Sequence, residues 1–270
     1  MKSSIVFITL LVAVTYQWHN FAHLATARIA RIELEKTTEG KEAVQWIESL
    51  LTPFSKMCGE GMYPFTECST WADKIKSQGW GSMFAWHFSN NYIRGPDADQ
   101  SIPLPLKDNA NASWAINEAY KTIQSCKTDR KGKSDSLLGK SISVRDLFHY
   151  VGDIHQPLHA GGRVTKALPD GDRGGNKFYI KHYKPRNFNN LHFLWDHQFD
   201  TGEEYWGPMT KPQSAHLTEW SLELMTEYEN DDAMKKQISE NWKFTDWEND
   251  SAQIVKDFVY EGLVENEEIP

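Results

Sequence analysis

The sequence of 270 residues is poor in cysteine, which limits what can hold its fold together. Its three cysteines, Cys58, Cys68 and Cys126, are too few for disulfides to be the main source of stability. In an exported protein, three cysteines favour one disulfide and one free thiol. Glycines and a proline lie between Cys58 and Cys68, so we expect these two to close a small loop.

The chain also lacks a basic balance, since its formal net charge is −8. Proteins that bind duplex DNA through many phosphate contacts usually carry a basic surface. An acidic protein that acts on nucleic acid must concentrate its positive charge locally, and bound metal ions are one way to do so. The composition therefore disfavours broad electrostatic binding of a duplex and leaves a local, metal-assisted site open.

No segment after the first residues is long and apolar enough to span a bilayer. The one apolar run, residues 5–14 after Lys2, is too short to cross a membrane and is typical of a removable signal peptide. We therefore expect a secreted, extracellular protein, or one in a secretory or periplasmic lumen, without a membrane anchor. Two N-x-[ST] sequons, at Asn111 and Asn249, are potential glycan sites in such a protein.

Helical periodicity dominates the chain, and no internal repeat interrupts it. Apolar residues recur at three- and four-residue spacing over residues 22–34, 41–51, 112–123, 143–154, 191–199, 214–228 and 251–264. Prolines and glycines separate these segments. Strand-like alternation is limited to residues 177–183, and residues 161–176 read as a long loop rich in Gly and Asp. These patterns predict an all-α fold, a mainly α-helical single domain with long functional loops.

Two histidine–aspartate pairs lie at helical spacing. His149 lies four residues before Asp153, and His192 lies four residues before Asp196. Residues four apart share one face of a helix, and the residues between them are largely apolar. An ionised aspartate in such a helix is costly to bury unless it is paired or metal-bound. A single pair would favour a plain contact on a helix surface, but the repetition favours a metal site.

Four further residues extend this set of metal-ligating types: His23, Asp73, His87 and His159. A mixed imidazole and carboxylate set suits zinc, whereas an all-oxygen set would suit calcium or magnesium. More than four candidates indicate more than one metal ion.

In their order and spacing these residues resemble the class I nuclease family, which comprises zinc-dependent, single-strand-specific nucleases and 3′-nucleotidases of the zinc phospholipase C superfamily. The matching elements are Trp18-x4-His23, the Trp-Ala-Asp ending at Asp73, Trp86-His87-Phe88, His149-x3-Asp153-x5-His159, Asp172-x-Gly174-Gly175-Asn176 and Asn190-Leu191-His192-x3-Asp196. Each element alone is a weak signal, but all of them in this order make a specific one.

The resemblance implies a mainly α-helical fold that holds three zinc ions. The first would be held by Asp73, His87, His149 and Asp153, and the second by His159, His192 and Asp196. The third would bind the α-amino nitrogen and carbonyl oxygen of Trp18, together with His23 and Asp153, so that Asp153 bridges two ions. His19 and Ala22 replace glycines that are common at these positions, and both add side chains near the third zinc.

A terminal amine at Trp18 suits this third site, because an α-amino group titrates near about pH 8 and yields its proton to a metal more readily than a lysine. We therefore expect a signal peptide over residues 1–17 and a trinuclear zinc nuclease domain over residues 18–270. Gln17 is not the small residue usual before a cleavage site, and cleavage after Ala13 is the alternative. That alternative would leave Trp18 internal.

The resemblance also implies roles around the metal ions. Asp73 and Asp153 would be catalytic as metal ligands, and Lys76, one turn after Asp73, would stabilise the charge of the transition state. A plain exposed lysine is the alternative for Lys76. Phe88 would stack on a nucleobase, while Asn90 and Asn176 would contact its edge. Because a base held in a duplex cannot present its face to Phe88, the preferred substrate would be single-stranded.

The expected function is therefore hydrolysis of single-stranded RNA and DNA to 5′-nucleotides, and removal of 3′-phosphates from nucleotides, by a metal-activated water. No stable protein partner is expected. The closest alternative is a zinc phospholipase C, but that branch typically carries Glu at the position of Asp196, and Phe88 and Asn176 match a base site. A secreted zinc-binding protein without catalysis would need a lost ligand, and every ligand position is filled.

Overall fold

Helices make up most of the chain. The computed structural model describes residues 19–76, 78–125, 137–183, 188–197, 205, 207–229, 231 and 243–267. Its α-helices are α1 (Asn20–Leu34), α2 (Thr38–Leu51), α3 (Pro64–Glu67), α4 (Trp71–Lys76), α5 (Ala112–Ser125), α6 (Leu137–Ile154), α7 (Pro157–Ala160), α8 (Leu191–Asp196), α9 (Lys211–Tyr228) and α11 (Phe244–Ile254). The 3-10 helices are η1 (Thr52–Phe54), η2 (Cys68–Thr70) and η3 (Gly81–His87), and a π-helical turn covers Val255–Val259. The all-α prediction is confirmed.

Four short strands form two small sheets within the described part of the chain. β1 (Asn91–Arg94) pairs in parallel with β2 (Gly161–Val164), and β3 (Tyr179–Tyr183) pairs antiparallel with β4 (Phe188–Asn190). The sequence predicted a strand only at residues 177–183.

Residues 161–176 were predicted to be loop, and this is wrong for their first four residues, which form β2. The glycines in this segment favour a loop in the sequence pattern, yet their lack of a side chain is what allows the strand to form. A Cβ on Gly161 would lie 2.7 Å from the carbonyl oxygen of Asn91 in the paired strand. A Cβ on Gly162 would lie 2.7 Å from Asp172 Oδ1. Glycine thus permits the close backbone approach that the parallel pairing needs.

The helix predicted over residues 251–264 is confirmed only for residues 251–259, which form the end of α11 and the π-helical turn after it, and α11 itself begins earlier, at Phe244. The start of α11 was missed because its buried face carries the charged residue Glu248 instead of an apolar one, so the apolar helical periodicity is interrupted there. That carboxylate accepts hydrogen bonds from Asn91 Nδ2 (2.8 Å), Lys107 Nζ (2.6 Å) and the hydroxyl of Ser113. The helix is therefore held through a polar network that links β1, α5 and the segment between them.

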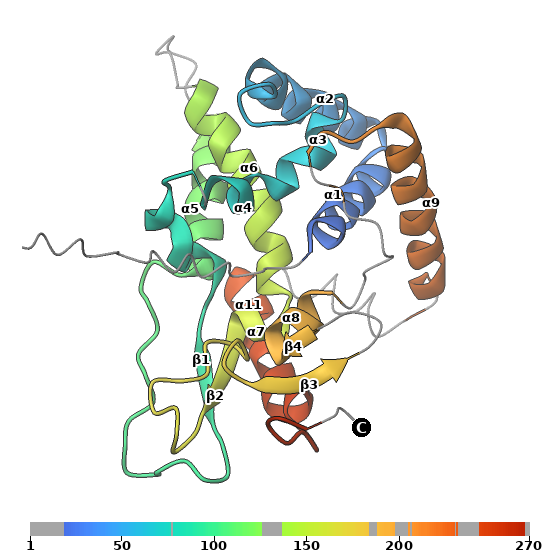
Figure 1. Ribbon diagram of the computed structural model, residues 1–270. Helices are drawn as coiled ribbons and strands as arrows, with labels where there is room; N and C mark the ends of the chain where they lie inside the picture. The colour runs from blue at the N-terminus through green and yellow to red at the C-terminus, as the bar shows by residue number, and fades with distance from the viewer. Residues whose placement is uncertain are drawn as a thin grey trace, which may run out of the picture.

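The long helix α6 runs through the middle of the helical part (Figure 1), packed against α5, α2, α1 and α4. On one side Tyr150 and Ile154 join a core with Ala72 and Ile116, and on another Val144 packs with Leu51. The same helix buries Arg145, His149 and Asp153. A helix that is apolar on several sides and also carries buried charge lies in the interior, and α6 is the element around which the site is built.

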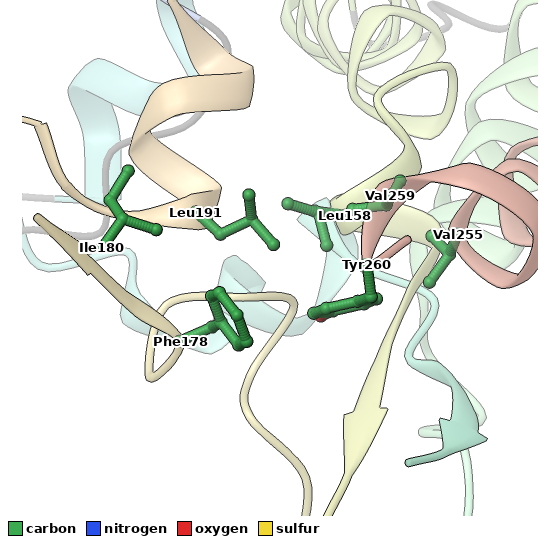
Figure 2. Packing of buried hydrophobic residues seen from close by; sticks show 7 residues of the cluster. All are labelled: Leu158, Phe178, Ile180, Leu191, Val255, Val259 and Tyr260. Atoms are coloured by element: carbon green, nitrogen blue, oxygen red, sulfur yellow. The ribbon is translucent and has the colours of Figure 1, made fainter. Parts of the chain in front are cut away.

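Another core packs β3 against α7, α8 and the π-helical turn near the C-terminus. Figure 2 shows its seven residues, Leu158, Phe178, Ile180, Leu191, Val255, Val259 and Tyr260. Leu158 precedes His159 and Leu191 precedes His192, so burial of these two leucines fixes the backbone of two predicted metal ligands.

The predicted disulfide between Cys58 and Cys68 is wrong, because both thiols are buried and free. Cys58 packs with Trp71 in one core, whereas Cys68 packs in another and its Sγ donates to the carbonyl of Phe65 at 3.2 Å. Two side chains in different cores cannot meet without moving backbone. Cys126, residues 1–17 and Trp18 lie outside the described residues.

Within the described ranges, no helix combines the length and the apolar character needed to cross a bilayer.

A buried ion pair between Arg145 and Glu60 holds helix α6 in place. Arg145 Nε and Nη2 donate to Glu60 Oε1 and Oε2 at 2.6 and 2.7 Å, and both side chains are 0 % exposed. Arg145 Nη1 also donates to the carbonyl of Ser141 at 3.0 Å. This pair joins α6 to the loop that carries Glu60.

We expect Glu60→Gln to lower the free energy of unfolding by about 3–5 kcal/mol, because it leaves the Arg145 charge buried without its counter-ion. The control is Glu118→Gln, whose partner Lys121 is 59 % exposed; an exposed pair contributes less than about 1 kcal/mol. Urea denaturation of both variants measures the difference. Equal, small losses would show that the buried pair does not stabilise the fold.

Candidate functional site

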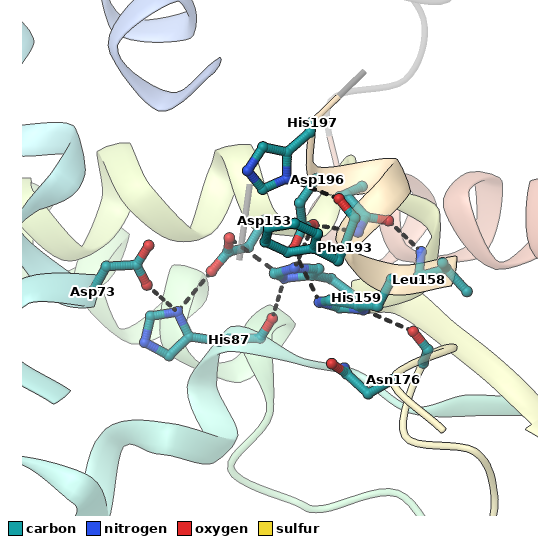
Figure 3. Close-up of polar contacts among 12 residues, drawn as sticks. Asp73, His87, Asp153, Leu158, His159, Asn176, Phe193, Asp196 and His197 are labelled. Carbon is teal, nitrogen blue, oxygen red and sulfur yellow. Dashed lines mark hydrogen bonds and ion pairs between the residues drawn. The ribbon is translucent and has the colours of Figure 1, made fainter. Parts of the chain in front are cut away.

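Five histidines and three aspartates gather beside α6 (Figure 3 shows several of them). They are His23, Asp73, His87, His149, Asp153, His159, His192 and Asp196. All are buried except Asp73, whose side chain is 19 % exposed. Every predicted metal ligand within the described residues is therefore brought to one place.

Local sequence explains how each element delivers its side chain. Asn190 caps α8, with its Oδ1 accepting from the Phe193 amide at 2.8 Å, so His192 and Asp196 lie on one face of that short helix. Pro157 occupies the first turn of α7, where it suits a helix start, and this places His159 on that turn.

Asp153 lies at the centre of the cluster. Its Oδ2 is 2.8 Å from His87 Nδ1 and 3.2 Å from His149 Nε2. Its Oδ1 is 3.4 Å from His23 Nε2 and 3.4 Å from His159 Nδ1. One carboxylate thus touches four imidazoles that come from α1, η3, α6 and α7.

The donor atoms fall into three groups, in each of which they lie within 4.8 Å of one another. The groups are His23 with Asp73 and His149, His87 with His149 and Asp153, and His159 with His192 and Asp196. The third group is the set predicted for the second zinc, and the second group contains three of the four residues predicted for the first. His23 groups with Asp73 and His149, and its Nε2 also approaches Asp153.

Backbone carbonyls orient three of the rings. The Nδ1 atoms of His149, His159 and His192 lie 2.6, 3.0 and 2.7 Å from the carbonyl oxygens of Ser69, His87 and Gly174. A ring that donates from Nδ1 keeps the lone pair of Nε2 for a metal. His87 is turned the other way and presents Nδ1 to Asp153.

The charges of the site follow from burial and from Asp153. Burial lowers the pKa of His87 to about 3 and lowers those of His23 and His159, so these rings are neutral and ready to bind. Against burial, Asp153 and Asp73 raise the pKa of His149 to about 10. Burial likewise opposes ionisation of Asp153, but His149 and His159 hold its pKa well below the usual range. A proton on His149 must leave before that ring binds a metal.

The loop with two glycines comes close to the ligand segments, which explains why glycine stands there. Gly174 and Gly175 have φ of +58° and +77°. A Cβ on Gly174 would lie 2.1 Å from the carbonyl oxygen of Leu158. Only glycine therefore lets the Gly174 carbonyl reach His192.

Of the residues predicted to meet substrate, Phe88 and Lys76 lie directly against ligand side chains of the cluster. The half-buried Phe88 ring lies 5.0 Å from the His159 ring between centroids. Asn90 adopts φ +55°, and Asn176 Nδ2 donates to the carbonyl of Arg173 at 2.9 Å. Lys76 Nζ lies 2.8 Å from Asp73 Oδ1 and its side chain is 13 % exposed, so the alternative of a plain exposed lysine is wrong.

Sequence reasoning missed Gln156, which is fully buried between two ligand segments. Its Nε2 donates to Asp196 Oδ1 at 2.7 Å. Glutamine is not a usual residue at a helix N-terminus, so its place before Pro157 carried no local signal. A polar side chain inside the run from Asp153 to His159 was the one feature that could have marked it.

The unpaired atoms of the cluster fit a metal site. Among the described residues, several buried atoms that face other ligand side chains have no hydrogen-bond partner, including His23 Nε2, Asp73 Oδ1, Asp153 Oδ1, His159 Nε2 and Asp196 Oδ2. Buried polar atoms without a partner are rare in native proteins. Imidazole and carboxylate donors together suit divalent transition metals.

A helical fold around a buried imidazole–carboxylate cluster is typical of metal-binding α proteins. The family model for S1/P1 Nuclease matches residues 18–270, which is nearly the whole chain. The protein belongs to the S1/P1 nuclease family, and the resemblance to class I nucleases is confirmed.

Named relatives agree with this assignment. The chain is 26 % identical to Endonuclease 2 of Arabidopsis thaliana over 93 % of this chain and 79 % of the relative. It is 30 % identical to Endonuclease 1 of the same plant, over 67 % of this chain and 53 % of the relative. Nuclease S1 of Aspergillus oryzae is 24 % identical over 69 % of this chain and 55 % of its own length. The matched part is thus just over half the length of the last two relatives.

We expect Gly174→Ala to destabilise the protein more than Gly59→Ala. Both glycines have positive φ, which costs about 1–2 kcal/mol for alanine. Among the described residues, a Cβ on Gly59 meets no atom within 4 Å, whereas one on Gly174 meets backbone at 2.1 Å. The clash should add about 1–3 kcal/mol. Denaturant unfolding measures both, and equal losses would contradict the close approach.

Proposed function

We propose that this chain is a secreted, zinc-dependent enzyme that hydrolyses single-stranded RNA and DNA to 5′-nucleotides and removes 3′-phosphates from nucleotides. Family membership and relatives named endonuclease and nuclease support the enzyme class, a hydrolase acting on nucleic-acid ester bonds. The half-buried Phe88 ring, which lies beside His159 of the buried ligand cluster, is the observation that supports action on single strands and nucleotides.

The proposed zinc ligands are those expected from the sequence. One ion would bind Asp73, His87, His149 and Asp153, and a second would bind His159, His192 and Asp196. A third would bind His23, Asp153 and the amine and carbonyl of Trp18, with the mature chain starting at Trp18. In support of the third site, the His19 amide donates to the carbonyl of Asp196 at 3.1 Å, so the residue next to Trp18 lies against the cluster.

Zinc held by these residues would lower the pKa of a bound water toward about 7 and so supply a nucleophile at neutral pH. Lys76, whose Nζ lies 2.8 Å from Asp73 Oδ1, would add a positive charge that stabilises a phosphoryl group as it gains negative charge. The protein then needs no serine, cysteine or histidine nucleophile.

Phe88 offers the surface on which a base stacks. Base–aromatic stacking contributes about 1–3 kcal/mol per base and tolerates any base. A paired base has no free face, so this contact selects single strands. Asn90 and Asn176 are proposed to meet the base edge, and the loop that carries Asn176 is the one that orients His192 through Gly174.

We expect purified protein to release acid-soluble nucleotides from single-stranded RNA and DNA, to lose this activity in EDTA and to regain it with zinc. Phosphatidylcholine is the control substrate and should remain intact. Full activity in EDTA would reject the metal mechanism, and cleavage of the lipid instead of nucleic acid would favour the phospholipase alternative.

Two variants sharpen this experiment. Asp153→Asn removes the carboxylate that touches four histidines and should abolish turnover. His155→Ala is the matched control on the same helical segment, because His155 is exposed and its Nδ1 binds only the carbonyl of Val151 among the hydrogen bonds seen for it. It should retain most of the activity, and equal losses would contradict the ligand assignment.

Base preference should be weak. The side-chain amide of Asn90 both donates and accepts hydrogen bonds, whereas an aspartate would only accept them. Asn90 can therefore suit any base edge, and we expect the 3′-mononucleotides to differ within about tenfold in kcat/KM, which is about 1.4 kcal/mol. Asn90→Asp should favour guanine, because a carboxylate only accepts hydrogen bonds and guanine presents adjacent donors at its edge. The substitution should leave the backbone unchanged, since both residues tolerate the φ of +55°.

The measurement is kcat/KM for each of the four nucleotides in the wild type and in Asn90→Asp. A wild-type preference of about a hundredfold for one base, unchanged by the substitution, would show that Asn90 does not contact the base.

A further inference from the structure

Gln156 connects three of the residues proposed to hold zinc. Its backbone amide donates to the carbonyl of Asp153 at 3.0 Å, and its own carbonyl accepts from the His159 amide at 2.9 Å. Its side chain reaches Asp196, which lies 40 residues later in the chain. Gln156 is 0 % exposed, so all these contacts are made without competing water.

The side-chain amide of Gln156 has only one workable orientation. The Leu158 amide at the start of α7 needs an acceptor, and Gln156 Oε1 accepts from it at 2.5 Å. A flipped amide would set an NH₂ group against that N–H. Nε2 therefore points to Asp196 Oδ1, where it donates at 2.7 Å.

This donation divides the Asp196 carboxylate into two unlike oxygens. Oδ1 is held by Gln156, whereas Oδ2 has no hydrogen-bond partner among the described residues and lies 3.3 Å from His192 Nε2. His159 Nε2, from the same group of ligands, lies 3.6 Å from Oδ1. One oxygen is therefore fixed and the other is left for a metal.

We propose that Gln156 is a positioning residue for the zinc held by His159, His192 and Asp196, fixing the Asp196 carboxylate through Oδ1 while it caps the turn that carries His159. This inference rests on the metal centre of the proposed function. Partners that orient metal ligands typically change metal affinity by about 10–100-fold when they are replaced.

The test is Gln156→Glu in the full mature chain, measured as zinc affinity by competition with a chromophoric chelator and as zinc per chain. Glutamate keeps the size and the acceptor for the Leu158 amide, but it cannot donate to Asp196 and adds a like charge. We expect one zinc to bind about 10–100-fold more weakly while the others are unchanged.

The matched control is Gln124→Glu, because Gln124 Nε2 donates to Tyr120 Oη at an exposed site on α5. Its zinc affinities should equal those of the wild type. Gln156→Met, which lacks both the donor and the added charge, should weaken the same single zinc. It decides the matter if the glutamate variant does not fold.

Wild-type affinity for every zinc in Gln156→Glu or Gln156→Met would overturn the inference, as would an equal loss at all sites. If the wild type itself bound no zinc, the proposed function would fail instead. Because neither readout uses a substrate, the two failures are distinguishable.

Discussion

Burial of the Asp153 carboxylate among four imidazoles is the constraint on which the rest of the structure depends. Moving one carboxylate out of water costs several kcal/mol unless charge or metal compensates, and Asp153 is 0 % exposed. The compensation comes from four separate elements, α1, η3, α6 and α7, which each bring one histidine to it. The fold can therefore be understood as a helical frame that holds these elements in contact.

The frame works by giving the ligand segments both space and support. Gly152 faces His23, and a Cβ there would lie 2.8 Å from the ring's Nδ1, so a small residue on α6 admits the imidazole of α1. The buried Arg145–Glu60 pair anchors the same helix one turn before His149. On the far side the core of Leu158 and Leu191 fixes the backbone beside His159 and His192. The same residues therefore stabilise the fold and hold the ligand side chains in position.

Local patterns were sufficient for much of this. The i, i+4 spacing of His149 and Asp153 and the apolar period of α1, α2, α5, α6 and α9 could be seen in the sequence. The resemblance then implied which zinc ion His23 and Asp73 would each bind. Contacts between segments far apart in the chain could not be predicted from the sequence. β2 depends on Asn91 lying against Gly161, α11 is held by a buried Glu248, and Gln156 acts on a residue far along the chain. The loop spacing of Cys58 and Cys68 suggested a bond that their packing prevents.

We propose that the buried cluster binds zinc at three places, one of which uses the amine of Trp18. The decisive measurement is elemental analysis of the active, purified chain, with its N-terminus sequenced. We expect three zinc ions per chain and a mature N-terminus at Trp18. Active protein with a single zinc, or with no zinc, would contradict it.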